Sequence, residues 1–231
     1  MRVGPTLGDF RSEIRSMPRR YAPAVFAMVL LLFGTLSFAT SSISRAAETD
    51  LQVATFAGGC FWCVESDFDS VPGVVRTISG YTGGLLMNPT YKQVSTGGSG
   101  HREAVQIFYN PEEVTYAVLL EVFWRSVDPT DDGGQFCDRG ESYKTAIFAN
   151  SPEQIQVAEE SKRQLELSGV LDQPIVTPIA VAGPFYPAED YHQDYYRKNP
   201  LSYGFYRWRC GRDARIEDLW GKDAHRGIAT H

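Results

Sequence analysis

The chain of 231 residues contains no internal repeat and no long low-complexity run, which excludes a solenoid or other repeat array. It also has little positive charge: 22 Lys and Arg residues stand against 28 Asp and Glu residues, and the net charge is -6. Proteins that grip nucleic acid through its phosphates carry a basic excess. We therefore expect no nucleic-acid partner.

Cysteine and histidine are scarce, with four residues of each. A closed structural zinc site needs four ligands, commonly from two pairs of closely spaced cysteines. Cys60 and Cys63 form one such pair, but Cys137 and Cys210 each stand alone, and no His-Glu-x-x-His motif occurs. We therefore expect no metal site.

Long apolar runs are also rare, and the one that stands out covers residues 24 to 40. Small residues follow it at Ser44-Arg45-Ala46, and arginines precede it at Arg11, Arg15, Arg19 and Arg20. This pattern predicts a secretory signal peptide over residues 1 to 46 and a folded domain over residues 47 to 231, exported to the periplasm or another extracytoplasmic space. An uncleaved membrane anchor is the alternative, although the run is at the short limit for a spanning helix.

Strand-like and helix-like patterns alternate along the rest of the chain. Strands are predicted over residues 51–57, 74–81, 102–110, 142–149 and 173–181. Helices are predicted from about Cys60 to Pro72 and over residues 115–127, 152–167, 188–198 and 214–221. This order favours an α/β or α+β fold: a single two-layer domain with a mixed central sheet flanked by helices.

The stretch "GGCFWCVES", residues 58 to 66, carries the clearest chemical signal. A thiol at a helix start has its pKa lowered by the unpaired N–H groups there, so Cys60 is expected to attack and Cys63 to resolve the product. Phe61 and Trp62 suggest a pocket for a small apolar group, or else they simply pack in the core. A static disulfide is the alternative for the cysteine pair, because four cysteines in an exported chain usually form bridges.

Several motifs together carry a family resemblance. "GGCFWCVES" is followed by "SGYTGG" (79–84), "PTYKQVSTGGSGHREAVQIFYNP" (89–111), "DRGESYKTAIF" (138–148) and "FYPAEDYHQDYY" (185–196). In this order they resemble the A-type peptide-methionine sulfoxide reductases, from about Val53 to Tyr196. The closing "YRWRCGRDARIEDLWG" resembles the tail of one branch of that family.

The resemblance implies a role for each matching residue. Cys60 matches the nucleophile and Glu103 the proton donor, while Phe61 and Trp62 match the walls that hold the substrate methyl group. Tyr91 and Tyr143 match the tyrosines that hydrogen-bond the sulfoxide oxygen, and Asp138 matches the acid beside them. It also implies a ferredoxin-like core, the S epimer of methionine sulfoxide as substrate, free or in proteins, a thioredoxin-like reductant, and no cofactor. We expect the chain to act as a monomer.

Two cysteines are candidates for the resolving thiol, because many relatives resolve through cysteines near the C-terminus. Cys63 is the first choice from its spacing, Cys210 is the second, and Cys137 is expected to be a buried free thiol. Two other functions stay open at this point. One is an exported thiol-disulfide oxidoreductase that uses Cys60 and Cys63, and the other is a secreted binding domain with two inert bridges.

Overall fold

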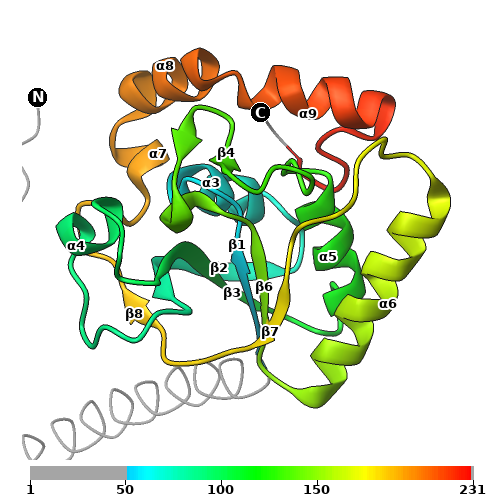
Figure 1. Ribbon diagram of the computed structural model, residues 1–231, viewed down its shortest axis with the longest axis horizontal. Helices are drawn as coiled ribbons and strands as arrows, with labels where there is room; N and C mark the ends of the chain where they lie inside the picture. Colours follow the sequence, from blue (N-terminus) through cyan, green and yellow to red (C-terminus); the bar gives the residue numbers. More distant parts are fainter. Residues whose placement is uncertain (1–50, 230–231) are drawn as a thin grey trace, which may run out of the picture. The chain divides into compact units, whose positions relative to one another are not determined.

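A six-stranded sheet lies at the centre of the part of the chain that this computed structural model describes, residues 51–229 (Figure 1). The strand order is β7-β6-β1-β3-β2-β8, and every neighbouring pair is antiparallel except β6 and β7. The strands are β1 (Gln52–Ala57), β2 (Val74–Thr82), β3 (Arg102–Tyr109), β6 (Ala146–Ala149), β7 (Ile179–Val181) and β8 (Tyr186–Pro187). The sheet is therefore mixed, as predicted.

The helices differ widely in length. They are α3 (Phe61–Asp69), α4 (Tyr91–Ser95), α5 (Tyr116–Trp124), α6 (Pro152–Ser168), α7 (Tyr195–Lys198), α8 (Pro200–Cys210) and α9 (Arg212–Trp220). Short 3-10 turns, η1 (Glu141–Tyr143) and η2 (Gly221–Asp223), and a two-strand ribbon, β4 (Gly134–Gln135) with β5 (Asp138–Arg139), complete the fold. The side chains of Thr115 and Ser151 cap α5 and α6 by accepting backbone N–H bonds.

The core lies between the sheet and the helices on one of its faces. The ring of Phe56 on β1 is 5.5 Å from Phe68 of α3 and 4.9 Å from Phe123 of α5. Because one strand side chain points to one face only, α3 and α5 pack on the same face of the sheet. Phe56, Phe68 and Phe123 are fully buried.

The strand register brings the start of α3 close to Glu103. Phe56 pairs with Val105 and Tyr81 pairs with Glu103, so the end of β1 and the start of β3 lie at the same edge of the sheet. Gly59 then turns the chain into α3 with a φ of 84°. A Cβ at this position would lie 2.6 Å from the Gln135 side chain, so the close approach requires glycine.

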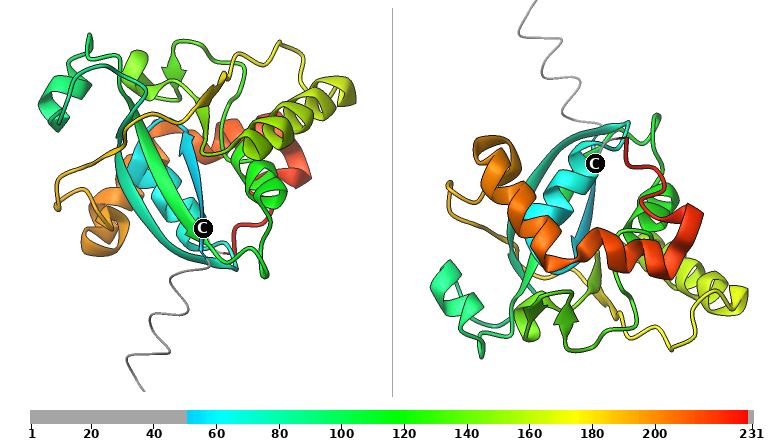
Figure 2. Two further views of the ribbon diagram at one scale, coloured as in Figure 1. Left: turned by 90° about the horizontal axis from the view of Figure 1, so that it is seen from below. Right: turned by 90° about the horizontal axis from the view of Figure 1, so that it is seen from above.

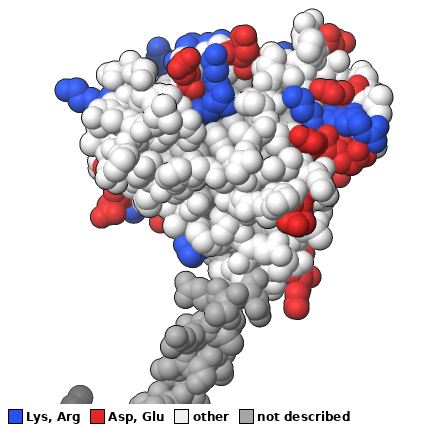
Figure 3. Space-filling view, turned by 60° about the horizontal axis from the view of Figure 1, so that its bottom comes forward, with Lys and Arg blue, Asp and Glu red and all other residues white. Residues whose placement is uncertain are grey.

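The C-terminal helices run across α3. In both views of Figure 2, α8 lies beside α3, and an ion pair of 2.7 Å joins Arg207 of α8 to Asp67 of α3. On the face shown in Figure 3, acidic and basic side chains are intermixed rather than gathered in one basic patch.

Most of the predicted elements are confirmed, and three were wrong in extent. The strand predicted over 142–149 covers only 146–149, because residues 141–143 form η1. The strand predicted over 173–181 covers only 179–181, since Pro174 and Pro178 have no N–H to donate to a ladder. In 188–198 only 195–198 is helical, and α4 and α8 were not predicted.

No helix within residues 51–229 is long and apolar enough to cross a membrane. The predicted signal peptide or anchor lies outside the described residues.

Candidate active site

Cys60 is the N-cap residue of α3, so the prediction of a cysteine pair at a helix start is confirmed. Its carbonyl oxygen accepts the N–H of Cys63 at 3.1 Å and that of Val64 at 3.3 Å. The two thiols hydrogen-bond one another. Cys60 is 7% exposed and Cys63 is 2% exposed, and no bridge joins them.

The predicted charge of Cys60 was wrong. Burial raises the pKa of Cys60 well above its usual value, and the hydrogen bond and charge of Cys63 raise it further, as do the nearby carboxyls of Glu103 and Asp138. These effects outweigh the helix start. The surroundings of the resting Cys60 therefore favour its thiol form.

Glu103 lies against the first turn of α3. The backbone N–H of Phe61 donates to Glu103 Oε2 at 3.0 Å, and the Glu103 side chain is almost completely buried. Burial raises the pKa of Glu103 to about 8, with smaller contributions from the charges of Asp138 and Cys63. At neutral pH Glu103 is therefore mainly a neutral acid with a proton to donate.

Two tyrosine hydroxyls lie close to Glu103. Tyr91 is the first residue of α4 and Tyr143 lies in η1, and their hydroxyls hydrogen-bond one another. Burial and then the charge of Glu103 raise the pKa of both phenols. Both stay protonated at neutral pH, and Tyr91 is held in place because its N–H donates to Glu189 Oε1 at 2.9 Å.

Phe61 and Trp62 have different surroundings. Phe61 is buried in the core beside Tyr81 and His192. Trp62 is half-buried; its indole stacks on Tyr195 at 3.8 Å and its Nε1–H donates to His192 Nδ1 at 3.1 Å. The Tyr206 ring meets Trp62 edge-on at 5.8 Å. Trp62 is thus fixed in an aromatic cluster beside Cys60, whereas Phe61 belongs mainly to the core.

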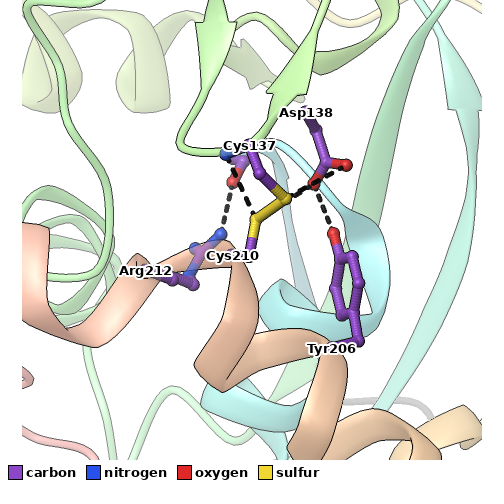
Figure 4. Close-up of a disulfide and its surroundings, with 6 residues drawn as sticks. Cys137, Asp138, Tyr206, Cys210 and Arg212 are labelled. Carbon is purple, nitrogen blue, oxygen red and sulfur yellow. Dashed lines mark hydrogen bonds between the residues drawn. A yellow bond between two sulfur atoms is a disulfide. The ribbon is translucent and has the colours of Figure 1, made fainter.

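Asp138 lies beside the Cys137–Cys210 disulfide and faces Tyr206 of α8 (Figure 4). The Tyr206 hydroxyl donates to Asp138 Oδ2. The sulfur atoms of Cys137 and Cys210 lie 3.8 and 3.9 Å from the Asp138 carboxyl oxygens. Burial raises the pKa of Asp138. Tyr206 belongs to α8 and also faces Cys60 and Cys63. The helix α8 therefore covers the thiol pair.

The prediction for Cys137 was wrong, because Cys137 is exposed and is bonded to Cys210. The two cysteines are 73 residues apart, and the bridge ties the segment before Asp138 to the end of α8. Cys210, the second choice as resolving cysteine, therefore has another partner in this structure. The alternative of a binding domain with two inert bridges is also wrong, since Cys60 and Cys63 are free.

The sequence did not reveal the contribution of the C-terminal helices to the site. Tyr195, Tyr206 and Arg207 lie 133 or more residues after Trp62 in the chain, and nothing in their spacing points to the thiol pair. The resemblance included His192, whose role here is to orient the indole of Trp62.

One group of three side chains in residues 51–229 has the spacing of metal ligands: Cys137, Asp138 and Cys210. Both of its sulfur atoms are committed to the disulfide. Neither is a thiolate in this state, so the group is a poor metal site.

Comparison with known families identifies residues 52–224 with the peptide methionine sulfoxide reductase family. The peptide methionine sulfoxide reductase MsrA of Bacillus licheniformis is 54% identical over 171 residues, which cover 74% of this chain and 94% of that protein. MsrA 2 of Rhizobium meliloti is 51% identical over 203 residues, 87% of this chain and all of that protein.

Solved structures of methionine sulfoxide reductases are also similar to this chain. Methionine sulfoxide reductase A of Corynebacterium diphtheriae superposes with a TM-score of 0.59 at 35% identity, over 66% of this chain and 76% of that one. Mxr1 from Saccharomyces cerevisiae in reduced form superposes with a TM-score of 0.62 at 30% identity, over 66% and 88%. With a family match over most of its length and relatives above 50% identity, the chain belongs to the A-type peptide methionine sulfoxide reductases.

Proposed function

We propose that this enzyme reduces methionine S-sulfoxide with Cys60 as the nucleophile, Glu103 as the proton donor and Cys63 as the resolving thiol. The observation that carries the proposal is that the buried Cys60 thiol and the buried, neutral Glu103 carboxyl lie together with the hydroxyls of two half-buried tyrosines. A nucleophile, an acid and hydroxyl donors are what reduction of a sulfoxide requires.

In the first step the Glu103 proton goes to the sulfoxide oxygen while the Cys60 sulfur attacks the substrate sulfur and gives up its own thiol proton to Glu103. The S–O bond to the substrate breaks as the hydroxyl moves to the Cys60 sulfur, methionine leaves, and Cys60 becomes a sulfenic acid. Tyr91 and Tyr143 are placed to donate hydrogen bonds to the oxygen, because both hydroxyls are protonated and lie beside Glu103. Trp62 provides an apolar wall for the substrate methyl group, and Phe61 supports it from the core.

In the second step Cys63 condenses with the Cys60 sulfenic acid, which releases water and forms a disulfide. The spacing of three residues at the start of α3 and the hydrogen bond between the thiols support Cys63 in this role. An external dithiol, thioredoxin-like in chemistry, then reduces the disulfide. The substrate is either free methionine sulfoxide or the same residue in oxidised proteins.

A general protein-disulfide oxidoreductase is the alternative. The neutral Glu103 and the tyrosine hydroxyls beside Cys60 argue against it, because exchange between thiols and disulfides has no oxygen that must be protonated.

We further propose that the chain is exported through its N-terminal segment and acts as a monomer. Export is supported by the arginines before the apolar run at 24–40 and by the exposed Cys137–Cys210 bridge, a bond that persists in oxidising compartments.

A stereospecific assay tests the proposal. The domain from Ala47 onward is incubated with the S and R epimers of a methyl sulfoxide and dithiothreitol, beside its Cys60→Ser form. We expect reduction of the S epimer alone, and none by Cys60→Ser. Equal turnover by Cys60→Ser would refute the assignment of the nucleophile.

A further inference from the structure

Cys63 shares one face of α3 with Asp67. The two residues are four apart in the helix, so their side chains lie one turn above one another. That face packs against the C-terminal helices. Asp67 Oδ1 is 2.7 Å from Arg207 Nη1, and Asp67 Oδ2 is 3.7 Å from Arg212 Nη2. Two guanidinium groups from α8 and α9 thus lie behind the second cysteine.

These charges do not balance within the protein interior. The side chains of Arg207, Arg212 and Asp67 are all buried, which places two positive charges against one negative charge. Asp213 also pairs with Arg207, at 2.7 Å, but its side chain is 38% exposed and its charge is partly screened by water. Among the fully buried side chains on this side of α3, positive charge therefore exceeds negative charge.

The charged groups near Cys60 are acidic, in contrast to the arginines near Cys63. Glu103 and Asp138 both face Cys60. The other groups that face Cys63 are Glu103 from β3 and the phenols of Tyr203 and Tyr206 from α8. The phenols are neutral near pH 7, and Glu103 is mainly neutral there. The hydrogen bond from Cys60 lowers the pKa of Cys63, and Arg212 and Arg207 lower it further against the effect of burial and of Asp67.

We propose that Arg207 and Arg212 are positioning residues that hold the negative charge of the reduced pair on Cys63 rather than on Cys60. The inference rests on the proposed role of Cys63 as the resolving thiol. The Cys63 thiolate attacks the sulfur of the Cys60 sulfenic acid, the S–S bond forms and the S–O bond breaks. The leaving hydroxide takes up a proton and departs as water.

The same asymmetry directs the reduction of the disulfide. A thiol leaves faster from a disulfide when its thiolate is more stable, so an incoming thiolate attacks the Cys60 sulfur and Cys63 leaves. The exposure of the two residues points the same way, since Cys60 is 7% exposed and Cys63 is 2% exposed. The mixed disulfide with a reductant therefore forms on Cys60.

The first test follows disulfide formation after one turnover, from pH 5.5 to 9.5, by trapping the sulfenic acid with a 1,3-dione. In Arg207→Met the midpoint of the rate profile should move up by about one pH unit, which makes the step about tenfold slower at pH 7. Arg207→Lys keeps the charge and should restore the native profile. Asp67→Asn removes a negative charge and should move the midpoint down.

Opposite shifts in Arg207→Met and Asp67→Asn would not arise from a structural role, which slows both variants at every pH. Shifts in the same direction, or no shift, overturn the inference. Methionine release in the same experiment reports the Cys60 step alone. If the native enzyme releases no methionine, the proposed function has failed, and the result says nothing about the roles of Arg207 and Arg212.

The second test uses the native chain and so does not depend on the variants folding. The oxidised enzyme is mixed with a thioredoxin-like protein whose second cysteine is serine, and the adducts are mapped by tandem mass spectrometry. Within the 60–63 pair we expect the adduct on Cys60. An adduct mainly on Cys63, or none on this pair, overturns the inference.

Discussion

At the scale of single residues, Glu103 shows how burial turns an ordinary strand residue into an acid. Alternation along β3 alone would allow a solvent-facing carboxylate at this position. The structure places it instead against the N–H of Phe61, away from water, where the charged form is disfavoured. The family resemblance, rather than the alternation of residues along the strand, identified Glu103 as a candidate proton donor.

Glu103→Gln should lower the rate of single-turnover methionine release by about 10²- to 10⁴-fold, because the amide keeps the size of the side chain but has no acidic proton. In the native enzyme the rate should fall as the pH rises through about 8, where Glu103 loses its proton. The variant should lack that fall. A native profile that stays flat to pH 10 would exclude Glu103 as the acid.

The same substitution should raise stability in alkaline solution. The pKa of Glu103 is about 8 in the folded chain against a usual 4.5, so between these values the folded state holds a proton that the unfolded state has lost. Stability therefore falls as the pH rises through this window. In thermal unfolding, the stability of Glu103→Gln relative to the native chain should increase from pH 5 to pH 9. A stability difference that does not change with pH would contradict this.

At the scale of elements, the helix α8 has two structural roles. Its inner side places Tyr206 over the thiol pair, and its last residue, Cys210, is tied to Cys137. The bridge closes a long loop and so restricts the unfolded chain. It lies outside the proposed sequence of thiol steps, which uses only Cys60 and Cys63.

Removing the bridge with Cys137→Ala and Cys210→Ala should lower the free energy of unfolding by about 2 to 5 kcal/mol. Methionine release with dithiothreitol should persist below the unfolding temperature. Denaturant titration and the single-turnover assay on one preparation check both points. Unchanged stability would show that the bridge does not constrain the fold, and loss of release would place it in the chemistry.

Elements stabilised by neighbouring residues could be predicted from the sequence, whereas elements that depend on distant residues could not. Helices such as α5 and α6 carry their own caps, Thr115 and Ser151, and could be read locally. The helix α7 and the short strands depend on distant contacts, such as the pairing of Tyr81 with Tyr186, and were predicted too long or missed.

At the scale of the whole molecule, the sequence contained the family and the cysteine pair but not the arrangement of charges around that pair. Motif residues such as Cys60, Glu103 and Tyr143 could be found by resemblance. The raised pKa of Cys60 and the pairing of Cys137 with Cys210 depend on how the tail packs over α3, and no local pattern reports that packing.

Export also belongs to this scale. We expect mass spectrometry of the protein from its native cell to find an N-terminus near Ala47 in an extracytoplasmic fraction. The small residues that end at Ala46 are the basis for this position. An intact segment 24–40 recovered in membranes would support the anchor instead.

The most direct test of the account is a map of the disulfides after one turnover without reductant. The enzyme, with its Cys137–Cys210 bridge formed, is given one equivalent of the S-sulfoxide and digested under non-reducing conditions, beside Cys63→Ser and Cys210→Ser. We predict a Cys60–Cys63 bridge in the native chain and in Cys210→Ser, and a trapped Cys60 sulfenic acid in Cys63→Ser after about one methionine per enzyme. A Cys60–Cys210 bridge with Cys63 free would contradict the account.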